Sequence, residues 1–423
     1  MIAFLIGALK IIVLLGFVIL IHECGHFFIA KLCKIKVTDF AIGFGPTLLK
    51  KQGKETLYAI RAIPLGGYIN MVGEEQRSDE PGSFSKASIP KRMAILFAGA
   101  IVNIIFGLLV YFIIISSFGN NLSTTIEKVI IGEGYQAEVV GLKSGDEVLK
   151  INGKKMRLKQ DVDKMLEKAK TTEIVLTVER DGNLHEIPIT PTKKEINYIG
   201  IYLGAPEKDL SSEIKEVIVG SPAEMTGILA GDIVISVNEI NTEEEPELIE
   251  KEISEFSGED ITILVNRNGE ILTFNVKPEV LERYYLGVEF GYAEKSFGNN
   301  IYYGFWRTVD FTVSIGDNLA RLFTGKVSAD QLIGPIGISE AVTRTEGFID
   351  FISLVAIISL SLGVTNLLPI PPLDGGKILL ILIEAVRRKP IAQELEIRIQ
   401  LAGFALLIGL SIYVAYNDVL RMF

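Results

Sequence analysis

The chain has 423 residues, 48 % of them hydrophobic, and a mean hydropathy of +0.36. These values exclude an ordinary soluble protein and indicate a membrane protein with a soluble insert. The formal net charge is −10 and no basic nucleic-acid-binding face is evident, so we expect no nucleic-acid partner.

The first apolar run, residues 2–32, contains an H-E-x-x-H motif formed by His22, Glu23 and His26. Histidines at positions i and i+4 of a helix face the same way, so both can bind one zinc ion while the glutamate reaches the bound water. The alternative is a histidine pair packed between helices. An ionisable glutamate at membrane depth argues against it, because its insertion costs about 2.5–3.5 kcal/mol. The motif therefore predicts a hydrolytic zinc site.

Four apolar runs are long enough to cross a bilayer, which takes about 20 residues. They are residues 2–32, 93–118, 349–368 and 401–414. Residues 31–92 contain eleven Lys and Arg, and Arg387, Arg388, Lys389 and Arg398 lie between the third and fourth runs. The positive-inside rule makes both loops cytoplasmic, so we expect the metal motif in the cytoplasmic half of the membrane and the insert at 120–348 outside.

The insert contains an internal repeat. Residues 137–152 match residues 223–238 at a constant shift of 86 positions, and a strand-turn-strand pattern follows each copy. Both copies resemble the PDZ family, whose core reads A-x-x-x-G-L-x-x-G-D-x-I-x-x-I-N. The resemblance implies two small barrels with grooves that can receive an extended peptide by strand addition. A rigid spacer that holds no peptide is the open alternative.

A catalytic zinc site usually takes three protein ligands, and the two motif histidines supply only two. His185, the third histidine of the chain, lies in the insert and is expected at its surface. The missing ligand should therefore be a carboxylate at membrane depth. Asp374 meets this requirement in the segment 366–376, where three prolines must unwind the third span and free backbone groups that lipid could not satisfy. A solvated helix end is the alternative reading of Asp374.

The H-E-x-x-H motif, the N-x-x-P-x-P-x-L-D-G-G pattern that begins at Asn366, and the PDZ-like repeats together resemble the site-2 protease family. The likeness covers nearly the whole chain. It implies Zn²⁺ as the cofactor, with His22, His26 and Asp374 as its ligands. It further implies that Glu23 is the general base and that Asn366 lies near the reacting carbonyl.

The resulting fold class is a polytopic α-helical membrane protein with four transmembrane helices, cytoplasmic-side membrane-associated β segments and two extracytoplasmic PDZ domains. We expect an N-terminal membrane half at 1–122 and a C-terminal membrane half at 349–423. Between them we expect PDZ domains at 123–204 and 205–292 and an amphipathic connector at 293–348.

Two segments, 43–46 and 58–68, look like the β segments of this family, one of which is thought to pair with substrate. Alternation of apolar and polar residues in 57–63 predicts a strand independently of the family. A substrate helix must be opened before its peptide bonds can be attacked, so an edge strand beside the zinc meets a physical need. Three residues in the second span, Phe97, Gly99 and Asn103, match a further family pattern, for which helix packing is the expected role.

The predicted function is zinc-dependent endopeptidase activity inside the membrane, in regulated intramembrane proteolysis. The expected partners are the lipid bilayer and single-span membrane proteins, such as anti-sigma factors or signal-peptide remnants, after a first cut outside. The expected location is the bacterial cytoplasmic membrane. A PDZ scaffold with an idle metal site and a zinc transporter are the rival interpretations, and binding of zinc without proteolysis would favour either.

Overall fold

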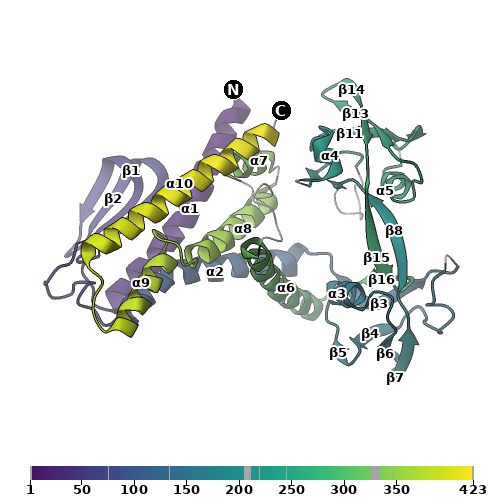
Figure 1. Ribbon diagram of the computed structural model, residues 1–423, viewed down its shortest axis with the longest axis horizontal. Coiled ribbons are helices and arrows are strands. Elements are labelled where there is room, and N and C mark those ends of the chain that lie inside the picture. Colours follow the sequence, from purple (N-terminus) through teal and green to yellow (C-terminus); the bar gives the residue numbers. More distant parts are fainter. Residues whose placement is uncertain are drawn as a thin grey trace. The chain divides into compact units, whose positions relative to one another are not determined.

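The structure is a computed structural model, and the residues that it describes follow in order. They are 2–74, 76–132, 134–203, 211–218, 220–243, 245–324, 334–345 and 347–421. The chain divides into two compact units (Figure 1). The helical unit is formed mainly by Met1–Phe118 and Leu332–Leu420, and the β unit mainly by Gly119–Arg307.

The helical unit contains four helices that are long and apolar enough to cross a membrane. They are α1 (Ile2–Leu32), α2 (Ile89–Phe118), α8 (Phe348–Asn366) and α10 (Gln393–Arg421). The four predicted spans are thereby confirmed. The last helix begins at Gln393, before the predicted start at residue 401. The prediction missed these first turns because they carry charged residues, which do not form part of an apolar run.

Further helices lie between these four in the sequence. They include α6 (Phe297–Phe323), α7 (Pro335–Arg344) and α9 (Asp374–Arg387). The connector predicted at 293–348 contains α6 and α7, and it includes residues 325–333, which lie outside the described residues. One apolar cluster joins α1, α7 and α8, where Leu14, Val18 and Val355 are almost fully buried. This packing fixes α1, the helix that carries the H-E-x-x-H motif.

A small β-sheet follows α1 in the sequence. It consists of β1 (Val37–Gln52) and β2 (Leu57–Met71), which include both predicted β segments. Residues 37–42 of β1 pair on one side with 67–71 and on the other side with 57–60 of β2. Among the described residues, no other strand pairs with 67–71, so this segment is an edge of the sheet.

The first β domain has the strand order β16-β3-β4-β6-β7, with β5 paired to β4. Val162 and Leu166 of its helix α3 are buried in the core that this sheet forms. Its elements are β3 (Leu122–Val129), β4 (Glu147–Ile151), β5 (Lys154–Lys155), α3 (Lys159–Ala169), β6 (Ile174–Arg180), β7 (Asn183–Ile189) and β16 (Val288–Tyr292).

The second β domain has a separate core and a sheet of order β12-β11-β13-β14. Ile249 and Ile253 of its helix α5 are buried against this sheet. Its elements are β9 (Ile201–Tyr202), β10 (Glu216–Val217), α4 (Pro222–Met225), β11 (Ile233–Val237), β12 (Ile240–Asn241), α5 (Glu247–Ser254), β13 (Ile261–Arg267) and β14 (Glu270–Val276).

The second β domain is nested within the first rather than following it. Strand β8 (Thr192–Tyr198) leaves the first domain and pairs along its whole length with β15 (Glu279–Tyr285), which returns to it. Strand β16 then pairs with β3. The predicted domain 205–292 therefore includes a strand that belongs to the first sheet, and it also covers 205–210, which lie outside the described residues. The sequence repeat locates each core but does not show which sheet a distant strand completes.

Each β domain has an internal ion pair at the same place in the repeat. Arg180 contacts the buried Asp146 through Nε–Oδ1 at 2.6 Å and Nη2–Oδ2 at 2.7 Å. Arg267 contacts Asp232 in the same way, with both distances 2.7 Å. Burial raises the pKa of Asp146, but its hydrogen bonds, chiefly from Arg180, outweigh that effect and hold the pKa below its ordinary value.

Candidate metal centre

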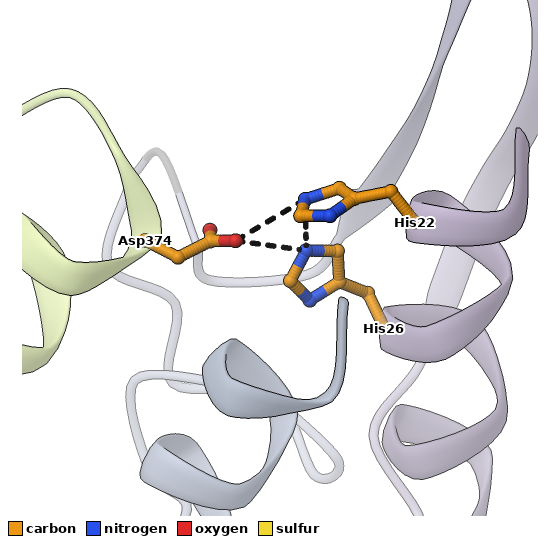
Figure 2. A group of neighbouring side chains, drawn as sticks. All are labelled: His22, His26 and Asp374. Atoms are coloured by element: carbon orange, nitrogen blue, oxygen red, sulfur yellow. Dashed lines mark hydrogen bonds and ion pairs between the residues drawn. The ribbon is translucent and has the colours of Figure 1, made fainter. Parts of the chain in front are cut away.

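The two motif histidines occupy neighbouring turns of α1 and point to the same side (Figure 2). Their Nε2 atoms lie 3.1 Å apart, and both side chains are buried. The i, i+4 spacing on a helix accounts for this convergence. The sequence therefore places two nitrogen ligands within reach of one ion.

Asp374 approaches the histidines from a different part of the chain (Figure 2). Helix α8 ends at Asn366, three residues before Pro369, and Asp374 is the first residue of α9. Its Oδ2 atom lies 3.2 Å from Nε2 of His22 and 3.3 Å from Nε2 of His26. The proline-rich break thus delivers a carboxylate at a helix N-terminus, where a negative charge is favoured.

Helix α2 packs directly behind the histidines. The Nδ1–H of His26 donates to the carbonyl oxygen of Ile95 at 2.8 Å. Gly99 is essential to this packing, because a Cβ there would lie 2.7 Å from Cε1 of His26 and 2.8 Å from Cε1 of His22. The glycine therefore lets α2 approach the imidazole rings without a side chain between them.

The ligand atoms fit a zinc ion. His26 donates from Nδ1, so in its neutral ring Nε2 carries the lone pair. That lone pair faces Nε2 of His22 and Oδ2 of Asp374, and the three atoms are 3.1 to 3.3 Å apart. Ligands about 2.0–2.1 Å from a tetrahedral zinc are separated by about 3.3–3.4 Å. A cation between these atoms would remove their mutual repulsion and match their spacing.

A polar cavity of about 230 Å³ contains these three side chains together with Glu23. Residues 68–71 of β2 also line it, which places the free sheet edge at the site. The Cγ atom of Glu23 lies 3.6 Å from the position that a Cβ on Gly67 would occupy. Glu23 thus stands between the candidate ligands and the edge strand.

Lys377 and Glu74 form an ion pair in the wall of the same cavity. Nζ of Lys377 lies 2.8 Å from Oε1 of Glu74. Lys377 is three residues after Asp374 on α9, so the two side chains share a helix face. Sequence reasoning missed this pair, although the i, i+3 spacing from Asp374 could have indicated Lys377.

Two other residues considered from the sequence are not among those that line this cavity. Asn366 is the last residue of α8, is half-buried, and is not among the residues that line the cavity, so its role stays a prediction. His185 is exposed on β7 of the first β domain. The structure therefore brings together His22, Glu23, His26 and Asp374, and it leaves Asn366 outside the cavity wall.

A family model described as peptidase family M50 matches residues 10–410 of the chain. Zinc metalloprotease RasP of Shouchella clausii is 31 % identical over 98 % of this chain and 99 % of that protein. The regulator of sigma-W protease RasP of Bacillus subtilis and the regulator of sigma E protease of Haemophilus influenzae are each 28 % identical, over 97 % of this chain and 98 % of each relative. These matches span essentially the whole chain, including both candidate ligand segments.

Solved structures match only part of the chain. The PDZ domain of HtrA3 bound to a phage-derived ligand is 25 % identical and covers 22 % of this chain and 93 % of that domain, with a TM-score of 0.18. The HtrA-type protease AlgW with a decapeptide is 13 % identical and covers 26 % of this chain and 42 % of that protein, with a TM-score of 0.20.

Proposed function

Because the chain belongs to peptidase family M50 and is a membrane zinc metalloendopeptidase, we propose that His22, His26 and Asp374 hold its zinc ion and that Glu23 is its general base. The observation that carries this proposal is the convergence of two imidazole nitrogens and one carboxylate oxygen at 3.1 to 3.3 Å. A proton on Nε2 of His22 would still leave the lone pair of His26 facing the carboxylate at 3.3 Å, whereas tetrahedral zinc satisfies all three atoms.

The bound zinc would polarise the scissile carbonyl and make its water a stronger nucleophile at neutral pH. Glu23 takes the proton that the attacking water loses and delivers it to the nitrogen of the leaving amine as the C–N bond breaks. Its position between the ligands and the edge strand, where Cγ is near Gly67, suits both transfers. Asn366 would hold the substrate or the oxyanion.

The substrate would bind as an extended strand along 67–71 of β2. A peptide in a transmembrane helix hides its carbonyls in helical hydrogen bonds, so it must unwind before hydrolysis. The free backbone groups of 67–71 offer replacement partners at membrane depth, and residues 68–71 line the cavity that contains Glu23. Strand addition at this edge would therefore place the opened segment against the general base.

We further propose that the substrates are single-span membrane proteins, such as anti-sigma factors, or signal-peptide remnants, already shortened by a first cut outside the membrane. The names of the Bacillus and Haemophilus relatives, which refer to sigma factors, support this class. The basic residues of 31–92 favour a bacterial cytoplasmic membrane orientation with the metal centre in the cytoplasmic half. The two β domains would then act outside, as PDZ domains.

The activity is testable in lipid nanodiscs with a tagged single-span reporter that lacks its ectodomain. Wild type should cut inside the span only when loaded with zinc, and Glu23→Gln should retain zinc but cut about 10²- to 10⁴-fold more slowly. His185→Gln is the matched control, because it removes the one histidine outside the motif and should change neither property. Near-wild-type cleavage by Glu23→Gln would remove Glu23 from the mechanism, and zinc loss in His185→Gln would overturn the ligand set.

The role of the β domains needs deletions that respect their nesting. Removing 122–292 deletes both domains completely, including β16, which would otherwise lose its partner β3. Replacing 199–278 by Asn-Gly deletes only the second domain, because Tyr198 and Glu279 are directly paired and a two-residue turn can join them. If deletion allows cleavage of reporters with intact ectodomains, the β domains exclude substrates whose ectodomains are too large. Slower cleavage of shortened reporters would support recognition of their new ends, and no change in either would contradict both roles.

A further inference from the structure

Two buried polar groups without partners lie near Gly99. One is Nδ1 of His22, and the other is the carboxamide of Asn103, whose side chain is completely buried in α2. Within the described residues, neither the amide oxygen nor the amide nitrogen of Asn103 has a hydrogen-bond partner, and neither does Nδ1 of His22. Buried groups of this kind are rarely left unpaired, and inside a membrane bulk water does not replace the partner.

The position of Asn103 on α2 directs its side chain toward the histidines. Asn103 lies one turn after Gly99, and side chains on a helix tilt toward its N-terminus, so the amide leans over the Gly99 turn. Positions i and i+4 on a helix have Cβ atoms about 5–6 Å apart. A Cβ on Gly99 would be 2.8 Å from Cε1 of His22, which is bonded to Nδ1. Helix geometry therefore leads us to expect that the amide and Nδ1 of His22 face the same space above the glycine.

The chemistry of the proposed zinc site requires an acceptor at this place. With Nε2 of His22 as a zinc ligand beside Oδ2 of Asp374, which lies 3.2 Å away, the neutral ring would carry its proton on Nδ1. The other histidine already follows this pattern, because Nδ1–H of His26 donates to the carbonyl of Ile95. Histidines that bind metals almost always donate the second ring proton, and the acceptor fixes the ring orientation.

We propose that Asn103 is a positioning residue for the zinc site: its Oδ1 accepts the Nδ1–H of His22, directly or through one buried water, and holds Nε2 toward the metal. The proposal rests on the ligand set described under Proposed function. It gives Asn103 a role beyond helix packing, which was its expected role from the sequence. Gly99 makes the interaction possible, since any side chain there would separate the amide from the ring.

The three histidines of the chain make this proposal accessible to NMR with ¹⁵N-labelled histidine. In the zinc-loaded His185→Gln protein, we expect two slowly exchanging Nδ1–H protons, one from His26 and one from His22. Asn103→Leu, which has nearly the same size but no acceptor, should remove or shift the His22 signal and keep the His26 signal as a sign of intact folding. Zinc affinity, measured by competition with a chelator, should fall about 10- to 100-fold. Asn103→Asp, which restores an acceptor, should recover both.

Ser359→Ala is the matched packing control. Ser359 is completely buried on α8, and its hydroxyl donates to the backbone oxygen of Asn103 at 3.1 Å. This variant alters the same helix contact without touching the amide, so it should keep both proton signals and wild-type zinc affinity. An unchanged His22 signal and affinity in Asn103→Leu would overturn the proposal, as would an equal loss in Ser359→Ala. Failure of the wild-type protein to bind zinc would instead contradict the proposed ligand set.

Discussion

Replacing Gly99 by alanine should disable the metal centre while leaving the fold in place. The added Cβ would lie 2.7 Å from Cε1 of His26 and 2.8 Å from Cε1 of His22, whereas ordinary van der Waals contact begins at 3.4 Å. Nε2 of His26 would be nearer still, so the rings or α2 must move by more than about 0.7 Å to accommodate one methyl group. Metal–ligand distances in a well-formed site deviate from their ideal values by only about 0.2 Å, so this displacement is larger than a tetrahedral zinc site allows.

We expect zinc affinity of Gly99→Ala to fall by more than about 100-fold, or about 2.8 kcal/mol. The assay is competition of the purified protein with a zinc chelator, followed by cleavage of a single-span reporter at saturating zinc. Cleavage should stay low even when zinc is saturating, because the metal would then be held in distorted geometry.

Gly107→Ala is the control for loss of helix packing. A Cβ on Gly107 would lie 2.7 Å from the carbonyl oxygen of Ala356, so this variant also creates a steric clash, here at the α2–α8 contact. It lies two turns further along α2, and it should keep zinc affinity near the wild-type value. Wild-type affinity in Gly99→Ala, or equal losses in both variants, would refute the steric argument.

Three further outcomes follow from individual contacts. Asp374→Asn should lower zinc affinity more than about 100-fold in chelator competition, and unchanged affinity would exclude Asp374 as a ligand. Arg180→Met should lower the free energy of unfolding of the first β domain by about 3–5 kcal/mol, measured by hydrogen exchange, because Asp146 would remain buried without its charge partner. The control Lys128→Met breaks an exposed ion pair and should change the same free energy by less than about 1 kcal/mol. The pKa of Asp146 is lowered by folding, so its contribution is complete above the unfolded pKa of about 3.9 and is lost as pH falls through the lower folded pKa. The protection of amides in that domain, expressed relative to their intrinsic exchange rate at each pH, should therefore fall below about pH 3.9 in wild type and less so in Arg180→Met.

The candidate ligands could be anticipated from the sequence because each depends on a local rule. Helical spacing places His22 beside His26, and the prolines before Asp374 end α8 where a buried carboxylate can enter. The contribution of α2 could not be derived in this way. Which residues of two helices face each other depends on how the helices cross, so the approach of Gly99 to the imidazoles appears only in three dimensions.

The β domains show the same limit at a larger scale. The repeat at a shift of 86 residues identified two similar cores, and each core lies where the repeat indicates. The strand that completes the first sheet follows the second β domain in the sequence, since Val288 pairs with Val129. Alternation of apolar residues predicts that a segment is a strand but not its partner, because any exposed edge offers the same backbone groups.

The arrangement of the cavity explains how hydrolysis can occur where water is scarce and the substrate begins as a helix. Three segments distant in the sequence meet there: α1 supplies two nitrogens and Glu23, α9 supplies the carboxylate, and β2 supplies a free edge. Strands in a sheet lie about 4.7–4.9 Å apart, so a peptide added to 67–71 would enter the space that Glu23 borders. The edge would stabilise the unwound substrate and the ligands would orient the attack, so neither element alone suffices for cleavage inside the membrane.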